Sequence, residues 1–245
     1  MNARRHPAGR PHKTGEDKTM KRTIYTQVSL DVPTIDEALG MAEGAVRAGI
    51  DWIEAGTPLI LGEGVHALRR LREAFPDKPI VADLKTMDGA GLEAQMMLEA
   101  GANYVVVMSQ AHWASVAEMV KMAKRCNGYV MADVLNAPDK PAAAKRMQEL
   151  GVDWIIMHTG FDERNHVPGS TPLTELRAVL DAVTIPVQAV GGLSIDQAVE
   201  CVNMGASSLV IGAPLAIRPD VFAAADEYEA ILRSAVKRVR VLAEG

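Results

Sequence analysis

The chain has 245 residues, of which 48% are hydrophobic and 23% charged, and its formal net charge is −5. This mildly acidic balance argues against a broad nucleic-acid-binding surface, and no apolar run approaches the ~18 residues that cross a membrane. Two distant cysteines, Cys126 and Cys201, exclude a disulfide scaffold and a thiolate-rich zinc site and are typical of a reducing, cytoplasmic compartment.

The first 22 residues contain seven Lys or Arg residues and two acidic residues. No hydrophobic segment follows them, so they do not have the pattern of a secretory signal. A transit peptide and a disordered extension are the two interpretations, and Met20-Lys-Arg-Thr also resembles a natural start. We predict a disordered basic tail over residues 1–22 and a folded catalytic domain over 23–245.

From residue 23 onward, short β-branched runs alternate with longer segments of helical spacing. The predicted strands are Ile24–Leu30, Trp52–Glu54, Ile80–Leu84, Tyr104–Val107, Tyr129–Ala132, Trp154–Met157, Val187–Val190 and Leu209–Ile211. Thr34 and Ser194 are predicted helix N-caps, and several helices end in a glycine turn that leads into the next strand, as at Gly49 and Gly205.

This pattern amounts to eight strands and eight helices in strict alternation. Strands that are apolar along their whole length indicate a sheet covered on both faces. We therefore predict an α/β fold, a single-domain (β/α)₈ TIM barrel. A doubly wound open sheet is the alternative, although it more often has fewer strands.

Polar residues follow the predicted strands, at the end of a barrel where active sites lie. The six ionisable residues at five strand ends are Asp31, Glu54, Asp83, Lys85, Asp133 and His158. A single Asp at a strand end is often a helix cap, but residues from five strands would converge on one axis. The pattern therefore favours a catalytic site at the mouth of the barrel.

The sharpest local motif is Asp83-x-Lys85-x-x-Asp88. Strand alternation points Asp83 and Lys85 to the same side, and Asp88 follows in the turn before the next helix. A lysine between two carboxylates stays charged, so it can stabilise an oxyanion or move a proton. The alternative is a structural ion pair of little energetic value.

Glu54 and Asp83 end neighbouring strands and offer two hard oxygen ligands, which suit Mg²⁺. His158 fits a general acid or base, and the alternative is a histidine that is simply bonded to a neighbouring carboxylate or backbone group. Gly191-Gly192 after the seventh strand and Gly212 after the eighth are typical of a backbone phosphate site. These residues predict a phosphorylated substrate and Mg²⁺-assisted proton abstraction next to a carbonyl.

At these positions the sequence resembles the orotidine 5′-monophosphate decarboxylase suprafamily, whose mark is Asp-x-Lys-x-x-Asp. Within it, the chain is similar, over roughly residues 24–235, to the group of 3-hexulose-6-phosphate synthases and 3-keto-L-gulonate-6-phosphate decarboxylases. The shared segments are Gln27-Val-Ser-Leu-Asp31, Asp51-Trp-Ile-Glu54-Ala-Gly-Thr57, Ala82-Asp-Leu-Lys-Thr-Met-Asp88, Met157-His-Thr-Gly-Phe-Asp162 and Val190-Gly-Gly192.

The resemblance implies a Mg²⁺-dependent lyase that passes through a cis-enediolate. The reaction is either addition of formaldehyde to ribulose 5-phosphate, with its reverse, or loss of CO₂ from a 3-keto sugar acid phosphate. The implied roles are metal binding by Glu54 and Asp83, enediolate stabilisation by Lys85, proton transfer by His158, substrate-hydroxyl binding by Asp31 and Asp133, and phosphate binding by Gly191, Gly192 and Gly212. A homodimer is also implied, in which Asp88 reaches the active site of the partner subunit.

Within this group, three features favour the synthase reaction: the apolar Phe161, where the decarboxylase has an arginine, Asp133 in place of Glu, and the Lys85-Thr-Met-Asp88 stretch. Leu61-Gly-Glu-Gly64 instead resembles the decarboxylase. Ala213 departs from both and carries no charge, so phosphate affinity is expected to come from backbone donors. We predict the synthase reaction, with the decarboxylase or another lyase or isomerase reaction on a sugar phosphate as alternatives.

Other classes of barrel are less consistent with these residues. A non-catalytic phosphate-binding barrel would have a broken lysine–carboxylate set, whereas this set is complete. Indole- or thiamine-pathway barrels share the glycines but not the Asp-x-Lys-x-x-Asp motif. A ribulose-phosphate epimerase would need histidines at several strand ends, and only His158 lies at one.

Overall fold

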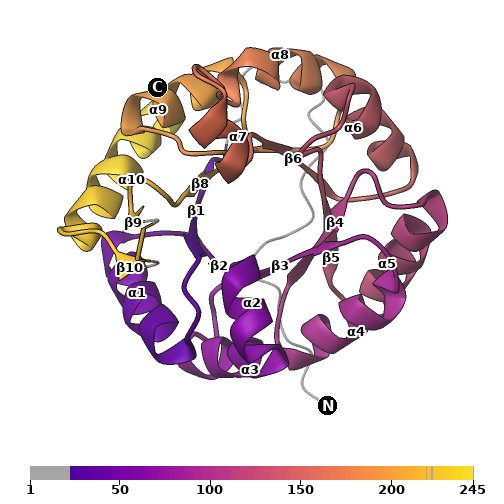
Figure 1. Ribbon diagram of the computed structural model, residues 1–245, viewed down its shortest axis with the longest axis horizontal. Helices are drawn as coiled ribbons and strands as arrows, with labels where there is room; N and C mark the ends of the chain where they lie inside the picture. The colour runs from indigo at the N-terminus through magenta and orange to yellow at the C-terminus, as the bar shows by residue number, and fades with distance from the viewer. Residues whose placement is uncertain (1–22, 219, 222, 245) are drawn as a thin grey trace.

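The computed structural model describes residues 23–218, 220–221 and 223–244, so the predicted tail over 1–22 lies outside the described residues. Eight parallel strands close into a barrel in chain order, with β1 hydrogen-bonded to both β2 and β8 (Figure 1). They are β1 (Tyr25–Leu30), β2 (Trp52–Ala55), β3 (Ile80–Thr86), β4 (Tyr104–Met108), β5 (Tyr129–Asp133), β6 (Trp154–His158), β7 (Val187–Val190) and β8 (Ser208–Ile211). The prediction of a single-domain TIM barrel is confirmed.

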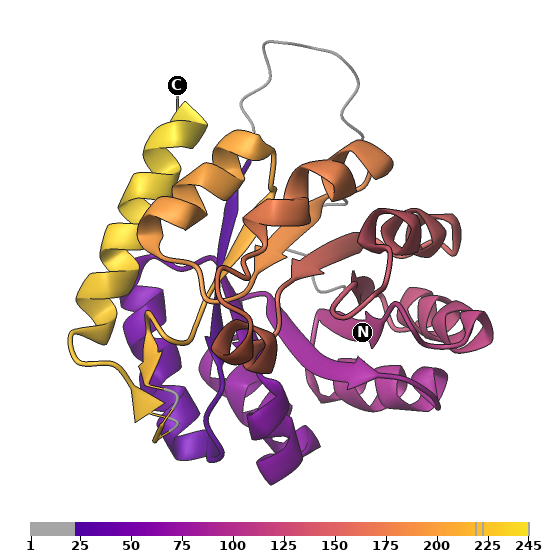
Figure 2. The same ribbon diagram turned by 45° about the horizontal axis from the view of Figure 1, so that its top comes forward.

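A ring of helices surrounds the strands and covers their outer face (Figures 1 and 2). Its members are α1 (Ile35–Ala48), α3 (Val65–Ala74), α4 (Ala90–Ala100), α5 (Trp113–Arg125), α6 (Lys140–Glu149), α8 (Leu173–Ala182), α9 (Ile195–Met204) and α10 (Tyr228–Glu244). No helix in the described part of the chain is long and apolar enough to cross a bilayer.

Two short helices exceed the predicted count of eight, which was therefore wrong for the described residues. They are α2 (Thr57–Glu63), which follows β2, and α7 (Phe161–His166), which follows β6. Both lie over the inside of the ring in Figure 1. The helical spacing of apolar residues missed α7 because none of its side chains is buried. Beyond β8, the two-residue strands β9 (Ile217–Arg218) and β10 (Ala223–Ala224) pair antiparallel.

Alternation along the strands produces two apolar cores. The larger core lies between the outward-facing strand residues and the helices, and the smaller one fills the inside of the barrel. Aromatic rings at the first residues of five strands, Tyr25, Trp52, Tyr104, Tyr129 and Trp154, form the floor of the barrel. The centroids of Trp52 and Tyr104 are 4.7 Å apart, a stacked contact. This floor fills the amino-terminal end, so open space remains at the carboxyl-terminal mouth.

The structure confirms some of the predicted helix caps and not others. Ser194 caps α9 through a complete capping box with Gln197, as expected. Thr34 has the backbone position of a cap before α1, but its side chain makes no capping bond. The Glu63 carboxylate instead accepts the Ile35 N–H at 3.1 Å. Gly49 takes the left-handed conformation predicted for a C-cap, with φ +93°.

Candidate active site

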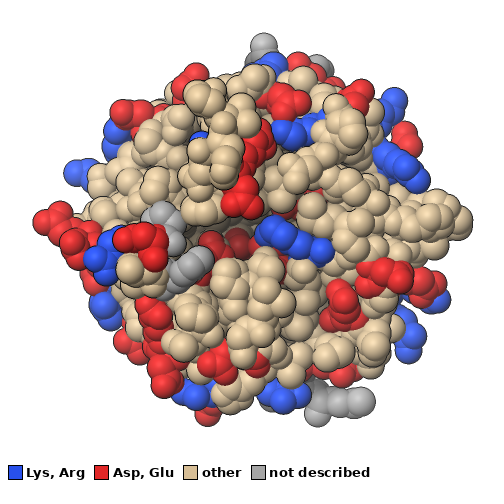
Figure 3. Space-filling model, viewed as in Figure 1, with Lys and Arg blue, Asp and Glu red and all other residues tan. Residues whose placement is uncertain are grey.

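A cavity opens at the carboxyl ends of the barrel strands and holds about 260 Å³ of space, counting its open mouth. Carboxylates and a basic side chain gather around this hollow in Figure 3. The lining residues are Gln27, Glu54, Val81, Asp83, Lys85, Val106, Asp133, Ile156, His158, Gln188 and Val190. Five of the six ionisable residues predicted at strand ends therefore meet in one cavity.

Glu54 is buried at the end of β2 and is held by two neutral donors from β1. The Gln27 side-chain amide donates to one of its oxygens, and the Ser29 hydroxyl donates to the other at 3.1 Å. Gln27 is itself fixed by the Gln188 amide at 2.9 Å. Burial raises the pKa of Glu54 well above its ordinary value, and the charges of Asp83 and Asp31 add to the effect.

Asp83 and Lys85 form an ion pair at the end of β3. The Thr57 hydroxyl donates to an oxygen of Asp83 at 3.0 Å and lies 3.3 Å from the Lys85 ammonium group. Burial alone would lower the pKa of Lys85, but the charges of Asp83 and Asp133 outweigh it and raise the pKa. Lys85 therefore stays a cation, as a group that stabilises an oxyanion must.

Strand alternation alone does not explain why Asp83 and Lys85 meet. The pairing of β3 with β4 shifts register between Ala82 and Thr86, and Lys85 takes a left-handed backbone conformation with φ +50°. Such a conformation is uncommon for residues other than glycine, and it is found where a site directs a side chain. A bulge therefore sets the direction of the lysine.

Asp133 and His158 form the second pair, across β5 and β6. The His158 Nδ1 atom lies 2.8 Å from one Asp133 oxygen, and the Leu135 N–H donates to the other at 2.8 Å. Burial would raise the pKa of Asp133, but the charge and hydrogen bond of His158 outweigh it and lower the pKa. The structure shows His158 bonded to a carboxylate, and its Nε2 atom has no hydrogen-bond partner among the described residues. Proton transfer by this second nitrogen stays a prediction.

Asp31 follows β1 and lies beside the same cavity, although it is not among the lining residues. Its carboxylate packs against Gly56, where any side chain would overlap it. Burial raises the pKa of Asp31, and the charge of Asp83 acts in the same direction while Lys85 opposes it. Asp31 is thus electrostatically coupled to the ion pair on β3.

Asp88 lies apart from this group. It is exposed in the turn between β3 and α4, and the Ser115 hydroxyl lies 3.3 Å from its carboxylate. It does not line the cavity of its own chain. The structure therefore brings together the first two charged residues of the motif and leaves the third at the surface.

The glycines predicted to bind phosphate follow β7 and β8 as expected. A Cβ on Gly191 would lie 2.5 Å from the Thr159 carbonyl oxygen, so backbone packing alone requires glycine there. A Cβ on Gly212 would meet only the Ser29 Cβ at 3.6 Å, an ordinary contact. The backbone N–H groups of Gly192 and Ala213 have no hydrogen-bond partner among the described residues. Within the described part of the chain, both donors are therefore free to bind a ligand.

The neutral residues that hold the charged ones were not among the predicted site residues. Gln27, Ser29 and Thr57 each donate a hydrogen bond to a site carboxylate. The signal was present in β1, where Gln27, Ser29 and Asp31 alternate as polar residues along a buried strand. A polar residue at every second position of a core strand points to one polar face.

The donor set fits Mg²⁺ held by Glu54 and Asp83. No group of three or more His, Cys, Asp or Glu residues among the described residues would hold a metal, so an all-protein cage is not what these residues provide. Mg²⁺ typically takes one or two carboxylates and completes its shell with water and substrate oxygens. Burial, and after it the charges of Asp83 and Asp31, raise the pKa of Glu54, and a divalent cation would offset both costs of ionising Glu54.

This arrangement combines a fixed cation, an oriented imidazole and three carboxylates around one cavity. Such a set can remove a proton next to a carbonyl and stabilise the negative charge that forms on oxygen. Free backbone donors at the ends of β7 and β8 can hold an anionic group beside it.

Comparison with known proteins agrees with the resemblance inferred from the sequence. A family model described as "Orotidine 5'-phosphate decarboxylase / HUMPS family" matches residues 25–228. A curated protein from Mycobacterium gastri named 3-hexulose-6-phosphate synthase is 35% identical over 206 residues, 84% of this chain and 98% of its own length. A solved structure of a 3-hexulose-6-phosphate synthase is 32% identical, with a TM-score of 0.75, over 85% of this chain and 99% of that one. A 3-keto-L-gulonate-6-phosphate decarboxylase from Vibrio cholerae is 27% identical, with a TM-score of 0.73, over 90% of this chain and 99% of that one.

Proposed function

The chain belongs to the orotidine 5′-phosphate decarboxylase / HUMPS family, and from this membership we propose that it is a lyase of the 3-hexulose-6-phosphate synthase type. Its reaction joins formaldehyde to ribulose 5-phosphate, or runs in reverse. The proposal rests on two side-chain pairs, Asp83–Lys85 and Asp133–His158, that line one cavity. The relatives named 3-hexulose-6-phosphate synthase support the choice of substrates.

In the proposed reaction, a proton leaves C1 of ribulose 5-phosphate and the electrons of that C–H bond form the enediolate with the C2 carbonyl. C1 then attacks the formaldehyde carbon, and the formaldehyde oxygen takes up a proton. His158, oriented by Asp133, carries the proton at these carbons. The Lys85 ammonium stabilises the negative charge on the enediolate oxygen.

Glu54 and Asp83 are the residues that would hold Mg²⁺, which supplies positive charge to the carbonyl and hydroxyl oxygens of the substrate when bound. Gln27 and Ser29 orient Glu54 for this role, and Thr57 orients Asp83. We assign the substrate hydroxyls to Asp31 and Asp133. The backbone around Gly191, Gly192, Gly212 and Ala213 binds the phosphate.

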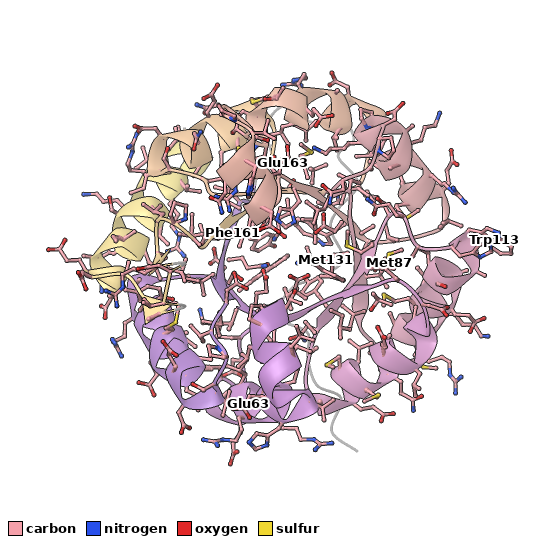
Figure 4. All side chains as sticks on the ribbon, in the orientation of Figure 1. Glu63, Met87, Trp113, Met131, Phe161 and Glu163 are labelled. Carbon is pink, nitrogen blue, oxygen red and sulfur yellow. The ribbon has the colours of Figure 1, made fainter. Side chains whose placement is uncertain are left out.

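The choice against the sister decarboxylation rests on Phe161, which begins α7 beside the mouth (Figure 4). An apolar ring at this position has no proton to donate to the carbanion that remains after loss of CO₂. The resemblance noted above implies an arginine at this position in the decarboxylase.

Both cysteines are free thiols, which suits a reducing compartment, and we place the protein in the cytoplasm.

We also propose a homodimer, formed through an apolar surface on α4, α5 and the turn before α4. Large exposed side chains gather there: Met87, Leu92, Met96 and Trp113. Met87 and Trp113 lie toward the α4–α5 side of the barrel in Figure 4. Asp88 is exposed next to Met87, so in this dimer its carboxylate would reach the active site of the partner subunit. An exposed apolar surface of this kind is typical of a protein interface.

A hybrid-dimer experiment tests this arrangement. Asp88→Ala and Lys85→Ala homodimers should each be nearly inactive, because each lacks one residue of every site. Mixed dimers would hold one site with both residues intact, so activity should return to about a quarter of wild type after complete subunit exchange. Absence of recovery after exchange has been verified by mass spectrometry would contradict the shared site.

The reaction itself is tested by mixing the purified protein with ribulose 5-phosphate, formaldehyde and Mg²⁺ and following loss of formaldehyde. We expect rapid loss that a chelator abolishes. Absence of formaldehyde loss from folded protein would reject the synthase reaction. Release of CO₂ from 3-keto-L-gulonate 6-phosphate in the same preparation would then establish the sister reaction.

A further inference from the structure

Arg164 lies on α7 and its guanidinium rests on the glycine turn that follows β7. A Cβ atom built on Gly192 would overlap Nη1 of Arg164 and would lie 2.6 Å from Cζ and 3.0 Å from Nε. Gly192 has φ +63°, so its backbone is turned in a way that residues with a side chain rarely adopt. The absence of a side chain at Gly192 therefore lets the guanidinium reach the backbone of the predicted phosphate turn.

The Arg164 side chain has no hydrogen bond or ion pair with any other described residue, and its Nε atom is buried without a partner. One oxygen of the neighbouring Glu163 carboxylate accepts a hydrogen bond from the Ser170 hydroxyl. The only aromatic contact the structure gives it within the described chain is the face of Phe161, 5.7 Å from Cζ. Burial lowers the pKa of Arg164, although an arginine remains charged at neutral pH.

The charge of Glu163 offsets part of the burial, but a partly buried guanidinium with no hydrogen-bonded anion still costs stability, and this indicates an anion that binds there. Glu163 is the carboxylate whose charge acts on Arg164, and it forms no ion pair or hydrogen bond with the guanidinium among the described residues. The turn after β7 offers the free N–H of Gly192, and the turn after β8 offers that of Ala213. Neither turn carries a charge of its own, since the residue after Gly212 is alanine.

We propose that Arg164 is the cationic phosphate-binding residue of this site and reaches the phosphate from the β6 side of the barrel. The guanidinium supplies paired N–H donors that match two phosphate oxygens, while Gly192 and Ala213 donate from the backbone. This inference rests on the proposed function for the identity of the sugar phosphate, but the phosphate contact itself does not depend on the reaction. It replaces the expectation that backbone donors alone supply phosphate affinity.

The position of α7 gives the contact a second consequence. Phe161 and Arg164 are three residues apart, so they share one face of α7, and the ring supports the guanidinium from one side. His158 ends the strand that leads into this helix. Phosphate binding would therefore also fix the position of α7 after β6.

Three variants test the proposal. Arg164→Gln removes the charge, and Arg164→Lys keeps the charge but loses the paired donors. Arg69→Gln is the matched control, because Arg69 is exposed on α3, whereas Arg164 lies against Gly192 in the turn after β7. Steady-state kinetics with ribulose 5-phosphate should show KM raised about 10- to 100-fold in Arg164→Gln, with kcat within about threefold of wild type. Arg164→Lys should fall between, and Arg69→Gln should match wild type.

A second measurement is independent of turnover. Inorganic phosphate should raise the Tm of wild type and of Arg69→Gln, relative to chloride at equal ionic strength, and should not raise that of Arg164→Gln. If wild type lacks synthase activity but this pattern holds, the proposed function fails and the phosphate role of Arg164 stands. Equal stabilisation of all three proteins would overturn the role. So would a fall in kcat at unchanged KM, because it would place Arg164 in the chemistry instead.

Discussion

The hydrogen bond between His158 and Asp133 leads to a quantitative prediction for Asp133→Asn. In the wild type, one Asp133 oxygen accepts the Leu135 N–H and the other lies 2.8 Å from Nδ1 of His158. The asparagine oxygen would keep the bond from Leu135, so its amide N–H₂ group would face the imidazole. An N–H donor there forces Nδ1 to accept, which moves the ring proton to Nε2. The nitrogen that should take the substrate proton is then already protonated.

The magnitude follows from the two contributions that are lost. A hydrogen bond to a charged group contributes about 1.5–3 kcal/mol, and each 1.36 kcal/mol is about a factor of ten in rate. Loss of the Asp133 charge alone should therefore lower kcat by about 10- to 150-fold. The inverted tautomer adds to this, as in hydrolases where the same exchange beside a catalytic histidine costs about 10⁴-fold. We expect a total loss in kcat of about 10²- to 10⁴-fold.

The assay is kcat and KM for formaldehyde consumption across pH 6–9, with Tm measured for each protein. Asp153→Asn is a suitable control, because Asp153 accepts the Val130 N–H at 2.9 Å at the opposite end of the same two strands. It should retain wild-type kcat. A kcat for Asp133→Asn within twofold of wild type, with an unchanged pH profile, would refute the assignment of Asp133 as the residue that orients His158.

Three further substitutions have clear expected outcomes. Lys85→Ala should lower kcat at least about 100-fold, and a Tm lowered by more than about 10 °C would instead make Lys85 structural. Glu54→Gln should abolish both activity and the rise in Tm produced by Mg²⁺. In metal-free buffer the variant should have a higher Tm than wild type, because burial raises the pKa of Glu54 and ionised Glu54 therefore destabilises the fold. The difference in Tm should be small near about pH 4.3, the unfolded-state pKa, and should widen as pH rises. A Tm difference that does not widen with pH would contradict this. Phe161→Arg should increase CO₂ release from 3-keto-L-gulonate 6-phosphate; an unchanged rate would remove Phe161 as the residue that separates the two reactions.

The strand ends were predictable from sequence for a geometric reason. In a parallel barrel, every strand runs in the same direction, so residues that follow strands separated by a hundred positions meet at one mouth. Glu54, Asp83 and His158 were identified in this way, and all three line the cavity. The prediction needed only the strand order and the period of two along each strand.

The partners of these residues were not predictable in the same way. Strand alternation placed Asp83 and Lys85 on one side but could not reveal the bulge that gives Lys85 its φ of +50°. The donors to Glu54 come from β1, and the register between β1 and β2 decides which residues of β1 lie opposite Glu54. Arg164 lies on a helix without buried side chains, so periodicity offered no signal for it.

Sequence alone therefore determined the architecture, because eight repeats of an apolar strand and an amphipathic helix suit a closed barrel, whereas an open doubly wound sheet more often has fewer strands. It also determined which residues reach the mouth. Only the tertiary structure decided which of them pair, with Lys85 bound to Asp83 and His158 bound to Asp133. Pairing depends on differences of a few ångströms between neighbouring strands and on helices placed by the loops, and such distances are not encoded in a period of two or of 3.6 residues.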